Sequence, residues 1–325
     1  MIISCGEALI DCFQHQDSAS FDAIIGGSPL NVAVALANAG SDAALMTNIS
    51  TDQFGEMHMA HLHSNNVATQ YISRSAHLSG LMFVQYRADK SATYNFYGHD
   101  TAELNYQFHD LSDIQSDDLS NDKTAFLTDA ITCLHFGSFS LVCGQTATSF
   151  AQLIKEQQQQ RIICVDINIR TAIEPDLQIW SDKFTQLMQQ VHILKASSED
   201  LCLLYDLENF TKQEALRIMT QWHKAGVAIA VITDAENGAY AMIDEQLIHV
   251  PALDVDIIDT VGAGDCFMAF FLNQLEQQHL LHINALPATT TEQLHKAVTA
   301  GITAAAFTVE HKGAQFPKLS ASTQR

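Results

Sequence analysis

The stretch Asp259-Thr260-Val261-Gly262-Ala263-Gly264-Asp265 places a glycine-rich turn directly before a strongly apolar segment, Cys266 to Leu275. This order predicts a loop that leads into a buried helix. The two glycines let backbone N–H groups converge on one point, and the first turn of a helix leaves its own N–H groups unpaired. Because the helix dipole adds roughly half a positive charge at that end, the stretch predicts an anion site for a transferring phosphoryl group.

Asp265 falls in the first turn of this helix, where the dipole favours its ionised form and allows it to accept a proton. Phosphoryl transfer asks mainly that the attacking hydroxyl be positioned and that its proton be taken late. The alternative is that Gly262 and Gly264 form an ordinary tight turn and that Asp265 only caps a core helix. Two other glycine motifs are excluded, because a dinucleotide fingerprint would need a glycine at Phe267 and no GxxxxGK[ST] loop occurs in the chain.

The motif DTxGAGD followed by an apolar helix resembles the second signature of the ribokinase-like (PfkB) family of sugar and nucleoside kinases. The resemblance implies that Asp265 is the catalytic base and that the backbone of Gly262, Ala263 and Gly264 stabilises charge on the γ-phosphate of ATP. The first signature of the family is expected near the N-terminus, where Gly26-Gly27-Ser28-Pro29-Leu30-Asn31 matches it. The resemblance covers nearly the whole chain, from about residue 6 to residue 317.

The composition of the chain limits the classes of partner that the protein is expected to bind. The chain has 325 residues with 47% hydrophobic and 16% charged, which suits a globular α/β protein with a substantial core. Its net charge of −21 argues against nucleic acid or an anionic membrane as a partner and favours a neutral sugar, although the few basic residues leave a phosphorylated sugar open. Seven scattered cysteines without a CxxC pair, and no signal peptide, indicate a cytoplasmic protein.

The first ten residues predict one buried strand, with Asp11 at its end. In open α/β sheets ligands bind beyond the carboxyl ends of the strands, so a carboxylate there can accept hydrogen bonds from ligand hydroxyls. The run Gly6-Glu7-Ala8-Leu9-Ile10-Asp11 is similar to the start of bacterial fructokinases, and this similarity implies that Asp11 binds the sugar. An exposed aspartate without a ligand is the alternative.

The next helix is predicted to start with Ser28 as its N-cap and Pro29 at its first position, and to stop at Gly40. Asn31 then lies in the first turn, where its amide can donate to and accept from a polyol. Gly26 and Gly27 would let the backbone approach that polyol closely. The resemblance implies that all three bind the sugar.

Residues from about 11 to 25 and from about 81 to 100 contain strand-like alternation inside an otherwise βα-alternating chain, and we expect them to form a small separate sheet. In the family such segments form a lid over the sugar, which implies substrate contacts from Tyr86, Asn95, Phe96 and Asp100. An edge hairpin packed on the main domain is the alternative. An apolar outer face of such a sheet would suit a homodimer.

Asp166-Ile167-Asn168-Ile169-Arg170 follows the strand that begins at Arg161 and resembles the family motif DPNxR, with Ile167 in place of proline. The resemblance implies that Asp166 contributes to a Mg²⁺ site and that Arg170 lines the substrate site, although Arg170 could face either sugar or nucleotide. Ser138, directly after the strand from Ile131 to Gly137, is a further expected substrate contact.

Lys195-Ala196-Ser197-Ser198-Glu199-Asp200 resembles a family stretch that approaches the nucleotide phosphates and Mg²⁺. It implies that Lys195 and Ser197 bind the nucleotide and that Asp200 helps to hold the metal. Alternatively, Ser197 caps a helix that has acids in its first turn.

Two further segments are expected to lie beside the nucleotide. Thr233 and Gly238 flank a turn expected beside ATP, in which Ala235 stands where the family commonly has glycine. The terminal loop from Thr308 to Ala314 resembles one that closes on adenine and often lines a monovalent-cation site. Asp259 and the backbone of Val261 would form the other side of a K⁺ site.

The order of the expected elements predicts an α/β fold with a doubly wound, mostly parallel sheet flanked by helices, as a single ribokinase-like domain over residues 1–325 with a β-sheet lid. The resemblance implies an ATP-dependent and Mg²⁺-dependent sugar kinase, with fructose as the first substrate and ribose, 2-keto-3-deoxygluconate and adenosine as alternatives. Gly98-His99 stands where many fructokinases have arginine. A non-catalytic sugar-binding regulator also stays open, whereas a Rossmann dehydrogenase would need a glycine motif after the first strand.

Overall fold

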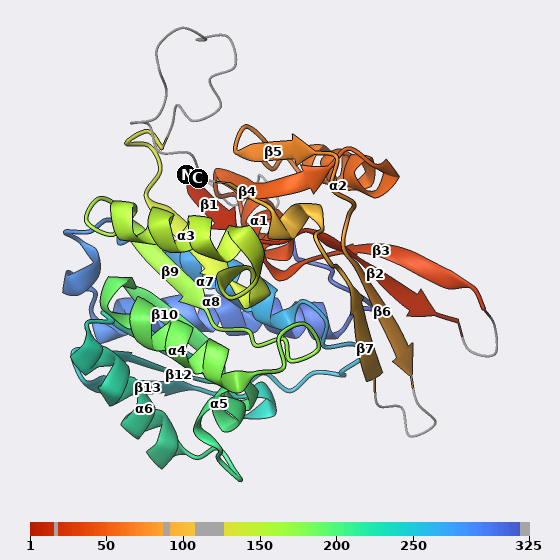
Figure 1. Ribbon diagram of the computed structural model, residues 1–325. Helices are drawn as coiled ribbons and strands as arrows, with labels where there is room; N and C mark the ends of the chain where they lie inside the picture. The colour runs from red at the N-terminus through yellow and green to blue at the C-terminus, as the bar shows by residue number, and fades with distance from the viewer. Residues whose placement is uncertain (16–18, 87–91, 108–126, 319–325) are drawn as a thin grey trace, which may run out of the picture.

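The computed structural model describes residues 1–15, 19–86, 92–107 and 127–318 (Figure 1). A nine-stranded sheet runs in the order β13-β12-β11-β10-β9-β8-β1-β4-β5. Neighbouring strands from β11 to β5 are parallel, and only β12 and β13 pair antiparallel. The strands are β1 (Ile2–Cys5), β4 (Ala43–Ser50), β5 (Ile72–Ser75), β8 (Cys133–Gly137), β9 (Ile162–Asp166), β10 (Ile193–Ser197), β11 (Ile229–Thr233), β12 (Ala239–Ile243) and β13 (Gln246–Val250).

Helices cover both faces of this sheet, which is why its central strands are apolar on both sides. On one face, the side chains of Phe150, Trp180 and Trp222 come from α3, α4 and α6 and join one core cluster. On the other, α1, α7 and α8 contribute to a second cluster that contains Phe267 and Phe271. The helices are α1 (Ser28–Asn38), α2 (Gln53–Ser64), α3 (Gly144–Gln157), α4 (Leu177–Leu187), α5 (Ser198–Tyr205), α6 (Lys212–Ala225), α7 (Ala263–Gln277) and α8 (Thr291–Val309). The predicted α/β fold with a mostly parallel sheet between helices is confirmed.

A second sheet of four strands projects from the side of the main sheet (Figure 1). Its order is β3 (Phe21–Gly26), β2 (Leu9–Gln14), β6 (Leu81–Tyr86) and β7 (Ala92–Tyr97). The strands β2 and β3 come from the first segment in which we expected strands, and β6 and β7 come from the second. We call this the small sheet.

The prediction of one strand over the first ten residues is wrong. The chain leaves the main sheet after β1, bends at Gly6, whose φ is 150°, and begins β2 of the small sheet at Leu9. A side chain at Gly6 would not fit, because its Cβ would lie 2.3 Å from Cγ of Pro29. The hydrophobic pattern did not show the break because both strands are apolar. Asp11 therefore lies within a strand of the small sheet, not at the edge of the main sheet.

Within the described residues, no helix combines the length and the apolar character needed to span a membrane.

Candidate active site

The glycine-rich stretch leads into α7 as predicted. Gly262 is the N-cap residue with a φ of 79°, and a Cβ there would lie 2.8 Å from the Cβ of Ala314 in the terminal loop. Glycine is therefore required both by the left-handed backbone and by close packing. Asp265 is buried in the first turn of α7, where the amides of Gly264 and Asp265 have no helical acceptor of their own.

Packing of α1 against α7 brings the two signature motifs together. Ser28 Oγ donates to Asp265 Oδ1 at 2.6 Å, and Asn31 Nδ2 donates to Asp265 Oδ2 at 2.9 Å. The prediction that Ser28 caps α1 is wrong, because the N-cap residue is Gly27 and no side chain caps the helix. The Ser28 hydroxyl instead contacts Asp265.

Asp11, expected to bind the sugar, is electrostatically coupled to Asp265. Burial raises the pKa of Asp11 to about 7, with Arg170 opposing this shift and Asp265 adding to it, so the three side chains share one electrostatic environment. Gly26 leaves room for the carboxylate, because a Cβ there would lie 2.1 Å from Asp11 Oδ2. Gly27 has a φ of 109°, and a Cβ there would lie 2.5 Å from the carbonyl oxygen of Glu7. Both glycines thus shape the backbone around Asp11.

A buried ion pair lies under the start of α7. Lys195 Nζ donates to Asp166 Oδ2 at 2.8 Å, and a Cβ placed on Gly264 would be 3.4 Å from the same nitrogen. Burial disfavours the charge of Lys195, but the charges of Asp166, Asp200 and Asp265 outweigh it and raise the pKa of Lys195. Burial also raises the pKa of Asp166, against the opposing charge and hydrogen bond of Lys195. An ammonium group therefore lies beside the glycine turn.

The structure favours the capping alternative for Ser197 and Asp200. Ser197 is the N-cap of α5, and Asp200 Oδ2 accepts from its backbone N–H at 2.9 Å and its hydroxyl at 2.7 Å. Asp200 Oδ1 accepts from the N–H of Ile169 at 2.8 Å. Both oxygens of Asp200 are therefore engaged, whereas Oδ1 of Asp166 is buried without a protein partner in the described part of the chain.

The remaining residues predicted to bind the nucleotide lie at the carboxyl edge of the sheet, Thr233 at the end of β11 and Gly238 in the turn that follows it. Thr233 pairs with Ser197 at the ends of β11 and β10. Gly238 has a φ of 93°, and a Cβ there would lie 2.1 Å from the carbonyl oxygen of Val250, so it is needed for packing. Ala235 has a φ of 43°, a left-handed conformation that its side chain disfavours.

Asp259 joins the loop before α7 to the terminal loop. Its Oδ1 accepts from the N–H of Val261 at 3.1 Å and its Oδ2 accepts from the N–H of Gly313 at 2.9 Å. The two segments expected to border a monovalent-cation site are therefore adjacent. No group of three or more His, Cys, Asp or Glu side chains suited to a metal occurs among the residues that the structure describes.

The register of the small sheet separates the residues expected to contact substrate. Asp11 pairs with Met82, which pairs with Phe96, so Phe96 lies on the face of Asp11 whereas Asn95 lies on the opposite face. The Phe96 ring packs on Phe139, with 5.6 Å between ring centroids. Tyr86 ends β6, and its side chain falls outside the described residues.

Two other expected contacts lie near the base of the small sheet. Asp100 is exposed, and its Oδ1 accepts from Asn105 Nδ2 at 2.9 Å. Ser138 is buried with a φ of 61°, and its hydroxyl has no hydrogen-bond partner among the described residues. Neither contacts Asp265 through a hydrogen bond recorded in the described chain.

The resemblance implied that the polar residues from Asp166 to Arg170 line the site, but sequence reasoning missed the link from Asn168 to the candidate base. Asn168 Nδ2 donates to Ser28 Oγ at 2.8 Å, and Ser28 in turn donates to Asp265, so two hydrogen bonds link Asn168 to the candidate base. The available signal was its position in a polar run directly after a buried strand, where ligand-side residues gather.

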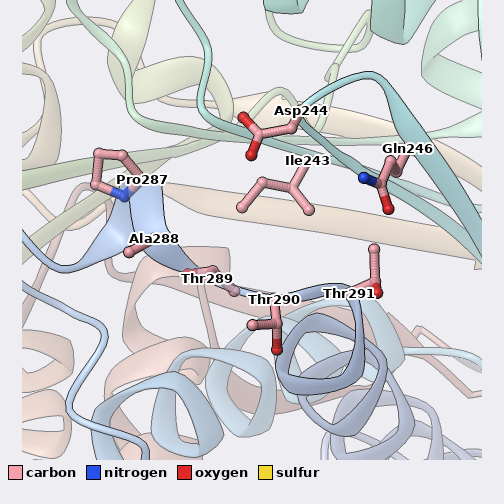
Figure 2. A pocket seen from close by; sticks show the side chains of 8 residues that line it. All are labelled: Ile243, Asp244, Gln246, Pro287, Ala288, Thr289, Thr290 and Thr291. Carbon is pink, nitrogen blue, oxygen red and sulfur yellow. The ribbon is translucent and has the colours of Figure 1, made fainter.

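A pocket of about 320 Å³ lies elsewhere, between the β12–β13 turn and the start of α8 (Figure 2). It is lined by Ile243, Asp244, Gln246 and residues 287–291, and it shares no residue with the cluster around Asp265. Pocket volume alone therefore does not mark the candidate active site, which is identified by its converging polar groups.

Over residues 1–321 the chain matches the family model described as pfkB family carbohydrate kinase. It is 30% identical over 284 residues to a fructokinase of Rhizobium leguminosarum bv. trifolii, a match that covers 86% of this chain and 81% of the relative. Its fold is similar to that of the fructokinase with bound ATP from Xylella fastidiosa, with a TM-score of 0.82, 23% identity and coverage of 96% of this chain and 93% of that one. A fructokinase double mutant from Vibrio cholerae O395, in fructose, ADP and potassium ion bound form, gives a TM-score of 0.76 at 22% identity, with 96% and 93% coverage.

Proposed function

This chain belongs to the pfkB family of carbohydrate kinases, and we propose that it is a fructokinase that transfers the γ-phosphoryl group of ATP to a primary hydroxyl of fructose. The observation that carries the proposal is the position of Asp265. It lies in the first turn of α7, accepts a hydrogen bond from Asn31, and interacts electrostatically with both Asp11 and the ammonium group of Lys195. A base between a polyol site and an anion site is what phosphoryl transfer to a sugar requires.

In the proposed reaction, the sugar oxygen attacks the γ-phosphorus, its proton passes to Asp265, and the bond to the bridging oxygen of ADP breaks. The first-turn amides of α7 and the charge of Lys195 stabilise negative charge on the phosphoryl oxygens. Losing one such donor typically costs about 10² to 10³ in rate, so the glycine turn should matter as much as the base.

Mg²⁺ fits this site through Asp166. Magnesium keeps several waters and is usually held by one or two carboxylates together with substrate phosphates, so a protein cluster of three ligands is not needed. Asp166 offers a buried oxygen without a protein partner, whereas both oxygens of Asp200 are engaged. When bound, Mg²⁺ would neutralise phosphate charge. For K⁺, we propose the junction of Asp259, Val261 and Gly313, and comparing turnover in K⁺ and Na⁺ buffers tests it.

Fructose is the proposed acceptor because the relative with 30% identity is a fructokinase. The experiment is ADP release from MgATP with fructose, ribose, 2-keto-3-deoxygluconate, adenosine and fructose 6-phosphate, for the wild type and for Asp265→Ala. We expect turnover of fructose that the substitution removes. Preferential turnover of another compound would replace the acceptor and keep the kinase, whereas sugar binding without turnover would support a regulator.

A homodimer through the small sheet is a further part of the proposal. Phe21, Phe83 and Tyr97 form edge-to-face ring contacts, each with 5.0 Å between centroids, on the face opposite Asp11. Phe21 is 39% and Tyr97 64% exposed, so the apolar ring surface is open to a partner. Sedimentation of the wild type should give a dimer that Tyr97→Lys weakens, and a wild-type monomer would contradict this. The cytoplasmic location stays a prediction, which cell fractionation would check.

A further inference from the structure

We propose that Ser28 and Asn168 are positioning residues that hold the carboxylate of Asp265 in the orientation needed for catalysis. The inference rests on the proposed kinase function. Asn168 Nδ2 donates to Ser28 Oγ at 2.8 Å, and Ser28 Oγ donates to Asp265 Oδ1 at 2.6 Å. The chain of hydrogen bonds joins the loop after β9, the first turn of α1 and the first turn of α7.

The amide of Asn168 sets the direction of this chain. An NH₂ group can only donate, so the Ser28 oxygen acts as acceptor towards Asn168 and its single hydrogen is left for Asp265. The hydroxyl therefore donates to the carboxylate and fixes the orientation of Oδ1.

The two carboxylate oxygens of Asp265 consequently have different surroundings. Oδ1 is held by the Ser28 hydroxyl, whose own acceptor side is occupied by Asn168. Oδ2 accepts from Asn31, a residue expected to bind the sugar. We assign Oδ1 to orientation and Oδ2 to the reacting hydroxyl.

The supporting residues are themselves fixed. Ser28 is buried in the first turn of α1, directly before Pro29. Asn168 has a φ of 44°, a left-handed conformation in which asparagine is enriched. The backbone on either side of it is held, since the N–H of Ile167 donates to the Lys195 carbonyl at 2.9 Å and that of Ile169 to Asp200 Oδ1 at 2.8 Å. Asp200 thus supports the loop that presents Asn168.

Four substitutions distinguish the direction of these hydrogen bonds from the packing of the Ser28 and Asn168 side chains. Ser28→Ala removes the hydroxyl and Ser28→Thr keeps it. Asn168→Gly removes the amide while allowing the left-handed backbone, and Asn168→Asp keeps the shape but presents an acceptor that competes for the Ser28 hydrogen.

For the acceptor sugar that the wild type phosphorylates, we expect kcat to fall about 10-fold in Ser28→Ala and Asn168→Gly, less than the roughly 10² that a 1 Å misplacement can cost. Asn168→Asp should be impaired at least as much, and Ser28→Thr should retain most of the activity. The KM values for sugar and MgATP should change little, because no binding group is removed.

A measurement without turnover keeps this inference separate from the kinase proposal. The resonance of the side-chain carboxyl carbon of Asp265, labelled with ¹³C and assigned by its loss in Asp265→Asn, should move in Ser28→Ala and Asn168→Asp but not in Ser28→Thr. An unchanged ¹³C resonance together with an unchanged kcat would overturn the positioning role while leaving the kinase intact. Impairment of Ser28→Thr equal to that of Ser28→Ala, in folded proteins, would also overturn it. A wild type without kinase activity would sink the proposed function, and the ¹³C resonance would still decide whether the hydrogen bonds through Ser28 and Asn168 hold Asp265.

Discussion

Replacing Glu103 by glutamine should stabilise the protein at and above neutral pH. Glu103 is buried in the short 3₁₀ helix Ala102–Leu104, where its Oε1 accepts from Thr101 Oγ1 at 2.5 Å and its Oε2 from the N–H of Gly80 at 3.2 Å. Gly80 directly precedes β6, so this carboxyl joins both ends of the β6–β7 segment to the main body. Glutamine keeps the shape and can still accept from Gly80 while donating to Thr101, whose hydroxyl also contacts the Gly98 carbonyl.

The size of this stabilisation follows from the pKa of Glu103. Burial, with a smaller effect from the charge of Glu7, raises the pKa of Glu103 from 4.5 to about 7, against hydrogen bonds that lower it. At 1.36 kcal/mol per pH unit, this difference corresponds to roughly 3 kcal/mol. The folded state binds the proton more tightly, so the contribution is fully present below pH 4.5 and is lost as the pH rises to about 7. Glutamine has no proton to lose and should avoid this loss.

The assay is urea unfolding of the wild type and of Glu103→Gln at pH 5 and at pH 8, with the exposed Glu208→Gln as the matched control. The stability advantage of Glu103→Gln should be about 2 to 3 kcal/mol larger at pH 8 than at pH 5. The control should show no such difference between the two pH values. An advantage of Glu103→Gln that is the same at both pH values would refute the argument from burial.

Three further results follow from the site. Ala235→Gly should raise the free energy of unfolding by roughly 0.5 to 1 kcal/mol, because it removes a left-handed alanine. As a control, Ala225→Gly in α6 should lower the free energy of unfolding. Thermal or urea melts measure both changes. The kcat/KM for the sugar should rise with pH through about 7 as Asp11 ionises, and Asp11→Asn should remove this limb from the pH profile along with much of the sugar affinity. Gly264→Ala should melt like the wild type, because the new Cβ would meet only Lys195 Nζ, at 3.4 Å. The variant should nevertheless raise the KM for MgATP, because the Cβ would crowd the phosphate. An unchanged KM would mean that the phosphate binds elsewhere.

The sequence predicted α7 and its turn well because all the determinants are local. Glycines that permit a left-handed cap, an acid in the first turn and an apolar run are adjacent in the chain, and each acts on its neighbours. The parallel sheet was predictable for the same reason, since buried strands are continuous apolar runs.

The roles of Ser28 and Asp200 were not predictable in this way. A serine before proline has the local pattern of an N-cap, and only the packing of α1 on α7 gives its hydroxyl a stronger acceptor 237 residues away. Asp200 was expected to help hold the metal. Together with Ser197 it also has the local pattern of a capping box, and the structure shows that capping box. Asn95 and Phe96 could not both face the sugar, because neighbouring residues of a strand point to opposite faces.

The charge distribution of the site is consistent with a nucleotide that enters with its metal. The chain carries a net charge of −21, and around Lys195 three carboxylates, Asp166, Asp200 and Asp265, face one ammonium group. A polyphosphate without a cation would meet an excess of negative charge there. The helix amides attract phosphate without adding net charge, and the partnerless oxygen of Asp166 leaves an acceptor that a hydrated divalent cation can use. We therefore propose that this acidic site selects for the metal complex of ATP, because that complex brings positive charge with it.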